Sequence, residues 1–552
     1  MSIWDAPEPG ADPRRPAAAA LLGALCALLA GCGADTPPAG EPRVAQATAV
    51  AAPDRGRLVR SLALDPESLD PHRAESLQAG HVLRELFEGL VAEDAEGRPI
   101  PGAALAWSHD PEWRLWRFEL RPEARWSDGR PLTAADWVAS FRRALDPATG
   151  SRSARLLEPI RHAAAVRRGE APPEALGVVA EGPLRLRIEL EHPLPGLPAL
   201  LALPIAFPVR LSAASAAPLG NGPFVLAERV PGSHLRLIPN PHFHAAAEVA
   251  IGELVYLPIE QASAGLARYR AGELDWLDEL PATAAAALPP ELAPELVVLP
   301  VLGTYYFGLN TTRPPLADPR VRLALALALD RDAIASLLGV PGRAAVTLVP
   351  PGVPEHRPQP PPWTGEPLAA RQRRAQALLA AAGYGPGRPL RFELRHNTGE
   401  DHRRIAIAAA ASWSRALPVE VRLHHEEFRS FLATRRRRET EMFRAGWVAD
   451  LPDPLDFLAL FRSGDPRNDC GFADPEFDAL LARAEGEADP RRRAEWLAHA
   501  ERRLLEAAPV IPVYHYVSRR LIRPWVRGWR PNPLDRHPSR WLRIEGRPAA
   551  AR

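Results

Sequence analysis

The stretch Leu390 to Leu423, LRFELRHNTGEDHRRIAIAAAASWSRALPVEVRL, predicts a strand, a helix and a second strand in succession. Apolar residues alternate with polar ones over 390–394 and again over 419–423, which is typical of half-buried strands. Residues 405–413 between them predict a helix. A strand-helix-strand unit of this kind is typical of α/β proteins.

The same alternation of strands and helices extends in both directions. Thr133 and Asp136 have the spacing of a capping box, Asp318-Pro319 is a typical helix start, and Gly383 is a typical helix stop. We expect a surface loop at 356–364 and a break near Pro490. The expected strands are 58–64, 116–120, 184–190, 224–226, 235–238 and 510–517, and the expected helices are 133–145, 321–329, 369–382 and 477–505. The chain is therefore predicted to be an α/β protein.

The amino-terminal segment has the order of a secretory signal. Arg14 and Arg15 precede an apolar run over 17–30, and Leu29-Ala30-Gly31-Cys32 follows. The run is shorter than the roughly 20 residues that span a bilayer. The tetrapeptide resembles the bacterial lipobox, whose cysteine is acylated and becomes the mature amino terminus. We predict a lipoprotein signal peptide at 1–32, lipidation of Cys32, and a flexible Pro/Gly/Ala-rich tether at 33–56.

Composition excludes several classes of protein. The 552 residues contain 68 basic side chains, all arginine, and 67 acidic ones, so the net charge is +1. This balance offers no electrostatic basis for nucleic-acid binding or for a polybasic membrane patch. Of the three cysteines, Cys26 would leave with the signal and Cys32 would carry lipid, which leaves Cys470 without an intrachain partner.

Seven local strings occur in the order and spacing of one known family. They are SLDPH (68–72) with LFEGL (86–90), RWSDG (125–129) with PLTAAD (131–136), RYRAGELD (268–275), GTYYFGLN (303–310), DPRVR (318–322) with DRD (330–332), RAGWVAD (444–450) and IPVY (511–514). On these strings, residues 57–544 resemble the oligopeptide-binding proteins of ABC importers, extracellular solute-binding proteins of family 5.

The resemblance implies a two-lobed periplasmic-binding-protein-like fold of the class II type, with an inserted extra subdomain and the ligand in the cleft between the lobes. Mapped onto this chain, residues 57–88, 207–300 and 518–552 would form a discontinuous first lobe. Residues 89–206 would form the inserted subdomain, and residues 301–517 would form the second lobe. Lobes of such proteins close around their ligand by a hinge motion.

A peptide offers an ammonium group, a carboxylate and a row of amides, so its cleft needs an acid, a base and free backbone groups. Arg444 and Asp450 supply both signs six residues apart, where a strand end runs into a loop. The resemblance implies that Asp450 binds the peptide ammonium, that Arg444 meets the carboxylate of a short peptide, and that the backbone of 446–448 (Gly446, Trp447 and Val448) binds the peptide as an added strand. The alternative is an Arg–Asp pair that holds a loop, and Trp447 is either a core residue or a pocket wall.

The resemblance also implies that Glu75 lines the cleft near the start of the peptide and that His402, at the start of a helix, faces the carboxylate of a longer peptide. The alternatives are a solvated acid and a capping or surface histidine. This chain departs from the family at three places. A family lysine falls near Gly339, a family tyrosine falls near Ser153, and a disulfide found in some members falls at Gly303 and Val448.

We expect no enzyme, because no catalytic or phosphate-binding motif such as G-x-S-x-G, G-x-x-x-x-G-K-[ST] or C-x-x-C occurs. The run His424-His425-Glu426-Glu427 is interpreted as a polar strand-to-helix junction. We expect no cofactor, no metal and no nucleic-acid partner. The prediction is a monomeric, lipid-anchored protein of the cell envelope, in the periplasm or on the outer face of the membrane, that delivers oligopeptides to a permease and its ATPases. The alternatives are another solute, such as a murein peptide, haem, an opine, a metal chelate or an oligosaccharide, and a peptidase.

Overall fold

Ten strands form the largest sheet in the computed structural model of the chain, which describes residues 55–210, 219–340, 343–354, 356–487 and 489–548. The predicted signal peptide with Cys32, and residues 33–54 of the predicted tether, lie outside these ranges. In spatial order the strands are β14 (Val419–Glu426), β13 (Leu390–Asn397), β15 (Met442–Val448), β12 (Leu296–Leu309), β16 (Val510–Ile522), β11 (Trp276–Leu277), β1 (Arg57–Leu62), β10 (Glu253–Pro258), β9 (His234–Pro239) and β8 (Phe224–Val230).

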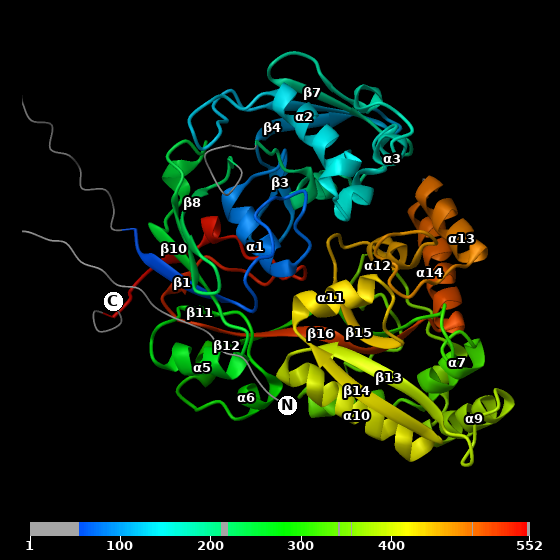
Figure 1. The fold of residues 1–552 in the computed structure, drawn as a ribbon. Coiled ribbons are helices and arrows are strands. Elements are labelled where there is room, and N and C mark those ends of the chain that lie inside the picture. Colours follow the sequence, from blue (N-terminus) through cyan, green and yellow to red (C-terminus); the bar gives the residue numbers. More distant parts are fainter. Residues whose placement is uncertain (1–54, 211–218, 341–342, 355, 488, 549–552) are drawn as a thin grey trace, which may run out of the picture. The chain divides into compact units, whose positions relative to one another are not determined.

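The predicted strand-helix-strand unit is confirmed. β13 and β14 pair in parallel, with Leu390 opposite Val419, and α10 (Glu400–Ala416) connects them (Figure 1). The helix is longer at both ends than the sequence pattern predicts. Trp413 of α10 is fully buried, and its indole N–H donates to the carbonyl of Leu325 at 2.9 Å.

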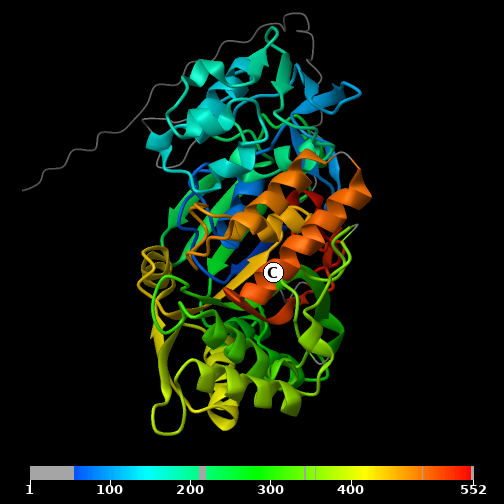
Figure 2. The same ribbon diagram turned by 90° about the vertical axis from the view of Figure 1, so that its right-hand side faces the viewer.

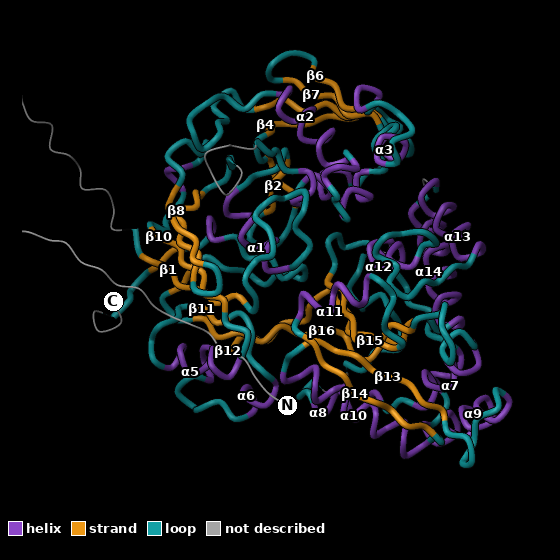
Figure 3. Tube along the Cα trace, viewed as in Figure 1, coloured by secondary structure: helices purple, strands orange, loops and turns teal. Residues whose placement is uncertain are grey.

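Two strands of unusual length, β12 and β16, run through the middle of this sheet (Figure 3). Their antiparallel pairing changes register between Pro300 and Thr304. At one end β16 pairs with β11, and at the other β12 pairs with β15. β16 continues five residues beyond the strand predicted to end at Val517. The lobe boundaries predicted near 300 and 517 fall inside these two strands, and the division into lobes stays a prediction.

A separate four-stranded sheet has its own core. Its order is β4 (Ala104–His109), β5 (Leu115–Leu120), β7 (Arg185–Glu189) and β6 (Val178–Ala180). The carboxylate of Asp136 accepts from the N–H of Thr133 at 2.8 Å, so the predicted capping box forms at the start of α2 (Ala134–Leu145). The buried side chains of this core all come from residues 90–206. Four further apolar clusters flank the ten-stranded sheet.

The remaining elements connect and cover these sheets. Helices α13 and α14 lie side by side, and residues 487–489 separate them, which confirms the break expected near Pro490 (Figure 2). The short strand pairs are β2 (Val91–Glu93) with β3 (Pro99–Pro101) and β17 (Val526–Arg527) with β18 (Arg543–Ile544). The other α-helices are α1 (Leu77–Leu86), α3 (Ala163–Arg167), α4 (Leu197–Leu201), α5 (Ala262–Arg270), α6 (Ala282–Ala286), α7 (Pro319–Ala328), α8 (Arg331–Leu337), α9 (Leu368–Ala381), α11 (Phe428–Arg436), α12 (Pro454–Leu458), α13 (Pro475–Gly486) and α14 (Pro490–Ala507).

The surface loop expected at 356–364 is wrong at both ends. The imidazole of His356 is buried against the carboxylate of Glu501 at 3.0 Å. Trp363 is only 6% exposed, and the guanidinium of Arg331 lies 5.3 Å from its ring centre. A high proportion of proline indicates that a segment lacks regular structure, because proline has no backbone N–H to donate. It does not indicate exposure to solvent, because the proline ring is apolar and can be buried.

Candidate functional site

The wall of a cavity of about 1810 Å³ is formed by residues of the ten-stranded sheet, of helices beside it and of the region 90–206. Most of the lining residues lie within 63–84, 152–156, 203–205, 260–262, 278–281, 396–407, 423–450, 460–470, 514–519 and 535–536. Arg444, Gly446, Trp447, Val448, Asp450, Glu75 and His402, the residues predicted to bind ligand, all line it. A ligand here would therefore contact segments that are far apart in the sequence.

The edge of β15 is open where it faces the cavity. Ala449 donates its N–H to the carbonyl of Leu302 at 2.7 Å, and successive residues of an antiparallel strand direct their backbone groups to alternate edges. Gly446 and Val448 therefore direct their N–H and C=O groups away from β12. On that side β13 pairs with β15 only at Met442 and Phe443. No described strand covers the backbone of residues 446–448 on this edge.

Tyr516 of β16 forms the floor beside this edge. A Cβ atom placed on Gly446 would lie 2.0 Å from the Tyr516 hydroxyl oxygen, so no other residue fits at 446 without moving the ring. A Cβ on Gly303 would lie 2.7 Å from the same ring. Gly303 and Val448 face each other directly across β12 and β15, and the tyrosine ring packs against the position where a cysteine side chain would begin.

Asp450 follows the end of β15, and hydrogen bonds to its own backbone groups hold it in place. Arg536 donates to the Asp450 carbonyl at 2.6 Å, and its guanidinium lies 3.7 Å from the Asp450 carboxylate. Arg536 also pairs with the buried carboxylate of Glu93. The Asp450 side chain is 38% exposed, so one flank remains open to the cavity.

A second carboxylate, Asp456, lies beneath the Asp450 loop. Its Oδ2 accepts from the indole N–H of Trp447 at 2.7 Å and from the N–H of Asp450 at 2.8 Å. Its Oδ1 is buried and has no hydrogen-bond partner among the described residues. Burial, and next the charge of Asp450, raise the pKa of Asp456 to about 7. Trp447 is thus half-buried, anchored through its nitrogen, and part of the pocket wall.

Arg444 brings a positive charge to the other end of the open edge. Its Nε donates to Asn397 Oδ1 at 2.5 Å, and its guanidinium lies 5.9 Å from the ring centre of Phe431. No carboxylate of the described residues lies within ion-pair distance of it. A carboxylate that entered the cavity would therefore find this charge without having to displace another anion.

His402 lies in the first turn of α10, as predicted, with its ring 5.8 Å from that of Tyr305. Burial, followed by the charge of Arg444, holds the pKa of His402 well below its usual range. Its buried Nδ1 has no partner among the described residues. The ring is neutral at pH 7 and can act as a hydrogen-bond donor or acceptor rather than as a cation.

Glu75 is placed on the cavity wall, where its partners differ from those of Asp450. Its carboxylate pairs with Arg436 of α11 at 2.5 Å and lies 3.7 Å from Arg152. These three residues come from the three segments predicted as first lobe, second lobe and inserted subdomain. Burial raises the pKa of Glu75 while both arginines oppose that shift. Its negative charge is already compensated by protein cations.

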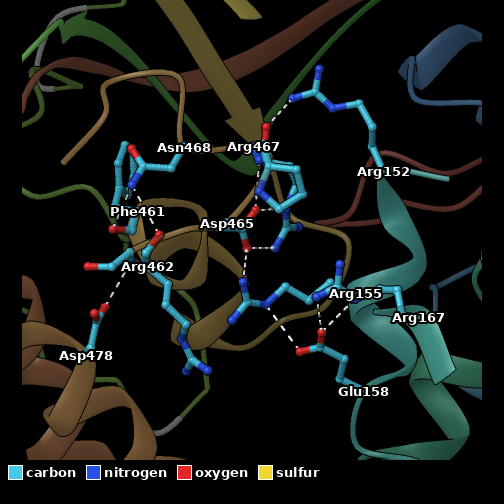
Figure 4. A network of polar contacts seen from close by, with 12 residues as sticks. Arg152, Arg155, Glu158, Arg167, Phe461, Arg462, Asp465, Arg467, Asn468 and Asp478 are labelled. Atoms are coloured by element: carbon cyan, nitrogen blue, oxygen red, sulfur yellow. Dashed lines mark hydrogen bonds and ion pairs between the residues drawn. The ribbon is translucent and has the colours of Figure 1, made fainter. Parts of the chain in front are cut away.

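Beside the cavity, further contacts connect residues 152–155 of the predicted inserted subdomain to residues 465–466 of the predicted second lobe (Figure 4). Arg155 lies 3.5 Å from the fully buried carboxylate of Asp465, and Arg152 donates to the carbonyl of Pro466 at 2.5 Å. Arg467 supplies a second cation to Asp465, at 3.1 Å. These contacts can form only while the two sides of the cavity are close together.

Three of the cavity residues that sequence reasoning missed are Asn397, Tyr516 and Glu279. Glu279 follows the two-residue strand β11 in the run Trp276-Leu277-Asp278-Glu279, where two acids directly after an apolar pair could have indicated a wall of a polar site. Among the described residues, no group of three or more His, Cys, Asp and Glu side chains is arranged to hold a metal ion. Within the same ranges, no helix combines the length and apolar character needed to cross a membrane.

Comparisons with known proteins agree with this architecture. The family model for bacterial extracellular solute-binding proteins, family 5, matches residues 98–469. The periplasmic murein peptide-binding protein MppA of Escherichia coli is 37% identical over 505 residues, which cover 89% of this chain and 94% of MppA. The periplasmic oligopeptide-binding protein OppA of Salmonella typhimurium is 36% identical over 532 residues, which cover 94% of this chain and 96% of OppA.

Solved structures confirm the predicted fold class and show which arrangement the chain adopts. The structure of Haemophilus influenzae OppA in complex with the peptide RPPGFSPFR, 33% identical, has a TM-score of 0.86 over 89% of this chain and 99% of that one. The unliganded open form of MppA, 37% identical, has a TM-score of only 0.66 over 89% and 98%. The described arrangement is therefore more similar to that of the peptide complex than to that of the unliganded open form.

Proposed function

Because this chain belongs to the bacterial extracellular solute-binding proteins of family 5, we propose that it is the substrate-binding protein of an ABC importer and that its ligand is an oligopeptide. One observation carries the proposal: an open strand edge lies in a large cavity, with an acid beyond one end and, at the other, an arginine that pairs with no carboxylate of the described residues. This arrangement is complementary to an extended peptide with charged ends.

The open edge would bind the peptide backbone by strand addition. Gly446 and Val448 offer two N–H donors and two C=O acceptors, which contact only main-chain groups of the guest. Six residues separate Arg444 from Asp450, so their Cα atoms are at most about 20 Å apart at roughly 3.3 Å per residue. An extended peptide of three to five residues spans about 10–17 Å. The side chains can therefore reach both ends of a short peptide.

The two charged ends would fix the direction of the peptide. Asp450 would accept the α-ammonium group, because its exposed flank faces the cavity. Arg444 would meet the carboxylate of a short peptide, and the neutral His402 would donate a hydrogen bond to that of a longer one. Glu75 would act on the ligand indirectly, since its contacts with Arg152 and Arg436 hold the cavity walls together.

Closure would occur between two lobes with the boundaries predicted above, through bending of β12 and β16 near their change of register. No covalent step and no catalytic group are part of this function. The partners would be a membrane permease and its ATPases, and the protein would be a monomer in the periplasm or on the outer face of the membrane, attached through lipid on Cys32.

Calorimetric titration with tri-, tetra- and pentapeptides tests the proposal. We expect saturable binding of peptides with free termini, and Asp450→Asn should weaken it by about 2–5 kcal/mol, the cost of losing one member of a buried charge pair. Glu420→Gln is the matched control, since Glu420 is exposed, pairs with Arg391 and does not line the cavity. Equal affinity of the Asp450→Asn and control variants would contradict the assigned role.

The alternative is a different solute in the same cavity. The relationship to the murein peptide-binding protein favours a murein peptide as the second candidate. Mass spectrometry of ligand that co-purifies with the chain distinguishes the two, because a murein peptide contains D-residues and a γ-linkage that ordinary oligopeptides lack. A ligand without a free amine would exclude the Asp450 contact altogether.

A further inference from the structure

Glu279 presents a carboxylate to the cavity that the function proposed above does not use. Its side chain is exposed, yet the space onto which it opens is the cavity itself. No hydrogen bond or ion pair joins it to any described residue. The neighbouring acids, in contrast, form ion pairs: Asp278 lies 3.5 Å from Arg60, and Asp535 lies 2.5 Å from Arg520.

The backbone places Glu279 beside the floor of the cavity. Leu280 donates its N–H to the carbonyl of Arg519 at 2.9 Å, which fixes this segment against β16 three residues from Tyr516. The Tyr516 hydroxyl in turn contacts the position of Gly446 on the open edge. Glu279 thus lies on the opposite side of the floor from β15.

Glu279 and Arg444 both act on the Tyr516 phenol between them. The charge of Arg444 lowers the pKa of Tyr516 and that of Glu279 raises it, while burial is the largest cause of the net upward shift. The surrounding cavity walls desolvate the Glu279 carboxylate and, together with neighbouring acids, raise its pKa to about 6, and Arg444 opposes this. The two groups therefore influence each other across the cavity, yet no ion pair joins them.

We infer that Glu279 is a specificity-determining residue that selects peptides with a basic side chain at the residue whose carboxylate meets Arg444. This inference rests on the proposed function. A carboxyl-terminal lysine or arginine carries both charges on one residue, and so satisfies Arg444 and Glu279 together. An uncharged residue at that position leaves the Glu279 carboxylate in the closed cavity without a cation, which disfavours closure.

A set of tripeptides tests the inference by calorimetry at pH 7.5, with the chain freed of bound ligand by unfolding and refolding. The probes are Ala-Ala-Ala, Lys-Ala-Ala, Ala-Ala-Lys and Ala-Ala-Glu. We expect Ala-Ala-Lys to bind at least about tenfold more tightly than Ala-Ala-Ala. The affinity of Lys-Ala-Ala should exceed that of Ala-Ala-Ala by a smaller factor, and Ala-Ala-Glu should bind more weakly than Ala-Ala-Ala.

Glu279→Gln should remove the preference for Ala-Ala-Lys and leave the affinity for Ala-Ala-Ala the same or higher. Glu279→Asp should retain part of the preference. Glu260→Gln is the matched control, because Glu260 is an exposed acid of the same cavity that follows β10 instead of β11. It should retain the full preference, and comparing unfolding curves of the three variants shows that each one folds.

The outcomes separate the two proposals. Failure of every tripeptide to bind would overturn the proposed function itself. Saturable binding of Ala-Ala-Ala together with equal affinity for Ala-Ala-Lys, or a preference that persists in Glu279→Gln, would overturn the role of Glu279 alone. A preference lost equally in Glu260→Gln would show that general charge, and not this position, selects the ligand.

Discussion

Replacing Asp456 by asparagine should make the free energy of unfolding less dependent on pH. The Asp456 carboxylate is buried beneath Asp450, with two donors on Oδ2 and none on Oδ1. Its pKa is raised to about 7 in the folded chain, whereas the ordinary value is 3.8. Because the folded state holds this proton more tightly than the unfolded state, stability falls as the pH rises between these values.

The magnitude follows from the difference in pKa. About three pKa units at roughly 1.4 kcal/mol each give about 4 kcal/mol of destabilisation that develops between pH 4 and pH 7 and persists above. Asparagine carries no charge, but its amide group would occupy the site of the unpartnered Oδ1 and cost about 1–3 kcal/mol at every pH. The free energy of unfolding of Asp456→Asn should therefore be about 1–3 kcal/mol higher than that of the wild type at pH 8. At pH 5 the variant should no longer be more stable.

Chemical denaturation between pH 5 and pH 8 measures this difference, with Glu420→Gln as the exposed control. Subtracting the two curves removes the other titrating groups, which both proteins share. A constant difference between Asp456→Asn and the wild type across this range would refute the reasoning, whatever its sign.

The same carboxylate links pH to ligand affinity. An ammonium group on Asp450 would offset the negative charge that raises the pKa of Asp456, so binding should release a proton. The affinity of the wild type for Ala-Ala-Ala should then increase as the pH rises through about 7. In Asp456→Asn this increase should vanish. If the affinity of Asp456→Asn depended on pH as that of the wild type does, Asp450 would not be the site that binds the ammonium group.

Two further changes test the floor and the closed arrangement. Gly446→Ala places a Cβ 2.0 Å from the Tyr516 hydroxyl oxygen and should lower the free energy of unfolding by about 1–3 kcal/mol in chemical denaturation. Gly387→Ala is the control and should not lower it, because a Cβ there meets nothing within 4 Å. Equal stabilities of the two variants would contradict the close approach at Gly446. Arg155→Gln removes the 3.5 Å contact with Asp465. In stopped-flow measurements, the dissociation rate of a bound peptide should rise about three- to tenfold, while its association rate stays the same. An unaltered dissociation rate would show that this contact does not hold the cavity closed.

Local periodicity was sufficient to predict most regular elements. Strand β5 has the burial pattern that its alternating sequence predicts, and α7 begins at Pro319 behind the Asp318 cap. Such signals are local, because a residue's neighbours in the chain determine the face that it buries. The helix boundaries differ by several residues at α10, because the prediction followed the apolar residues 405–413 and not Gly399 and Pro418, which flank the helix.

The two long strands could not be predicted in full, for a physical reason. β16 passes from one apolar core to another, and its middle residues line the cavity while they also pack against the first of these cores. The polar run 518–520 therefore breaks the alternation although the strand continues to Ile522. A strand that crosses a cleft has no single buried face, so its sequence lacks the period of two.

The predicted site residues reach one cavity, but how they are paired was not visible in the sequence. Glu75 contacts Arg436, which is 361 positions away, and Arg444 contacts Asn397 from another strand. Partners so distant leave no pattern in any short window. The resemblance could place Asp450 and Arg444, whereas Glu279 required the fold that brings β11 beside β16.

The kinds of contact in this cavity set a bound on what it can discriminate. If a peptide binds as proposed, four backbone hydrogen bonds at Gly446 and Val448 would contribute about 1 kcal/mol each, and two charged ends would contribute about 2 kcal/mol each. Their sum, about 8 kcal/mol, corresponds to micromolar affinity before the loss of translational freedom is subtracted. Backbone and termini alone therefore bind weakly and cannot distinguish one peptide from another of equal length. Side-chain contacts must supply the remainder, so a single carboxylate such as Glu279, which pairs with no described residue, would determine which peptides the cavity prefers.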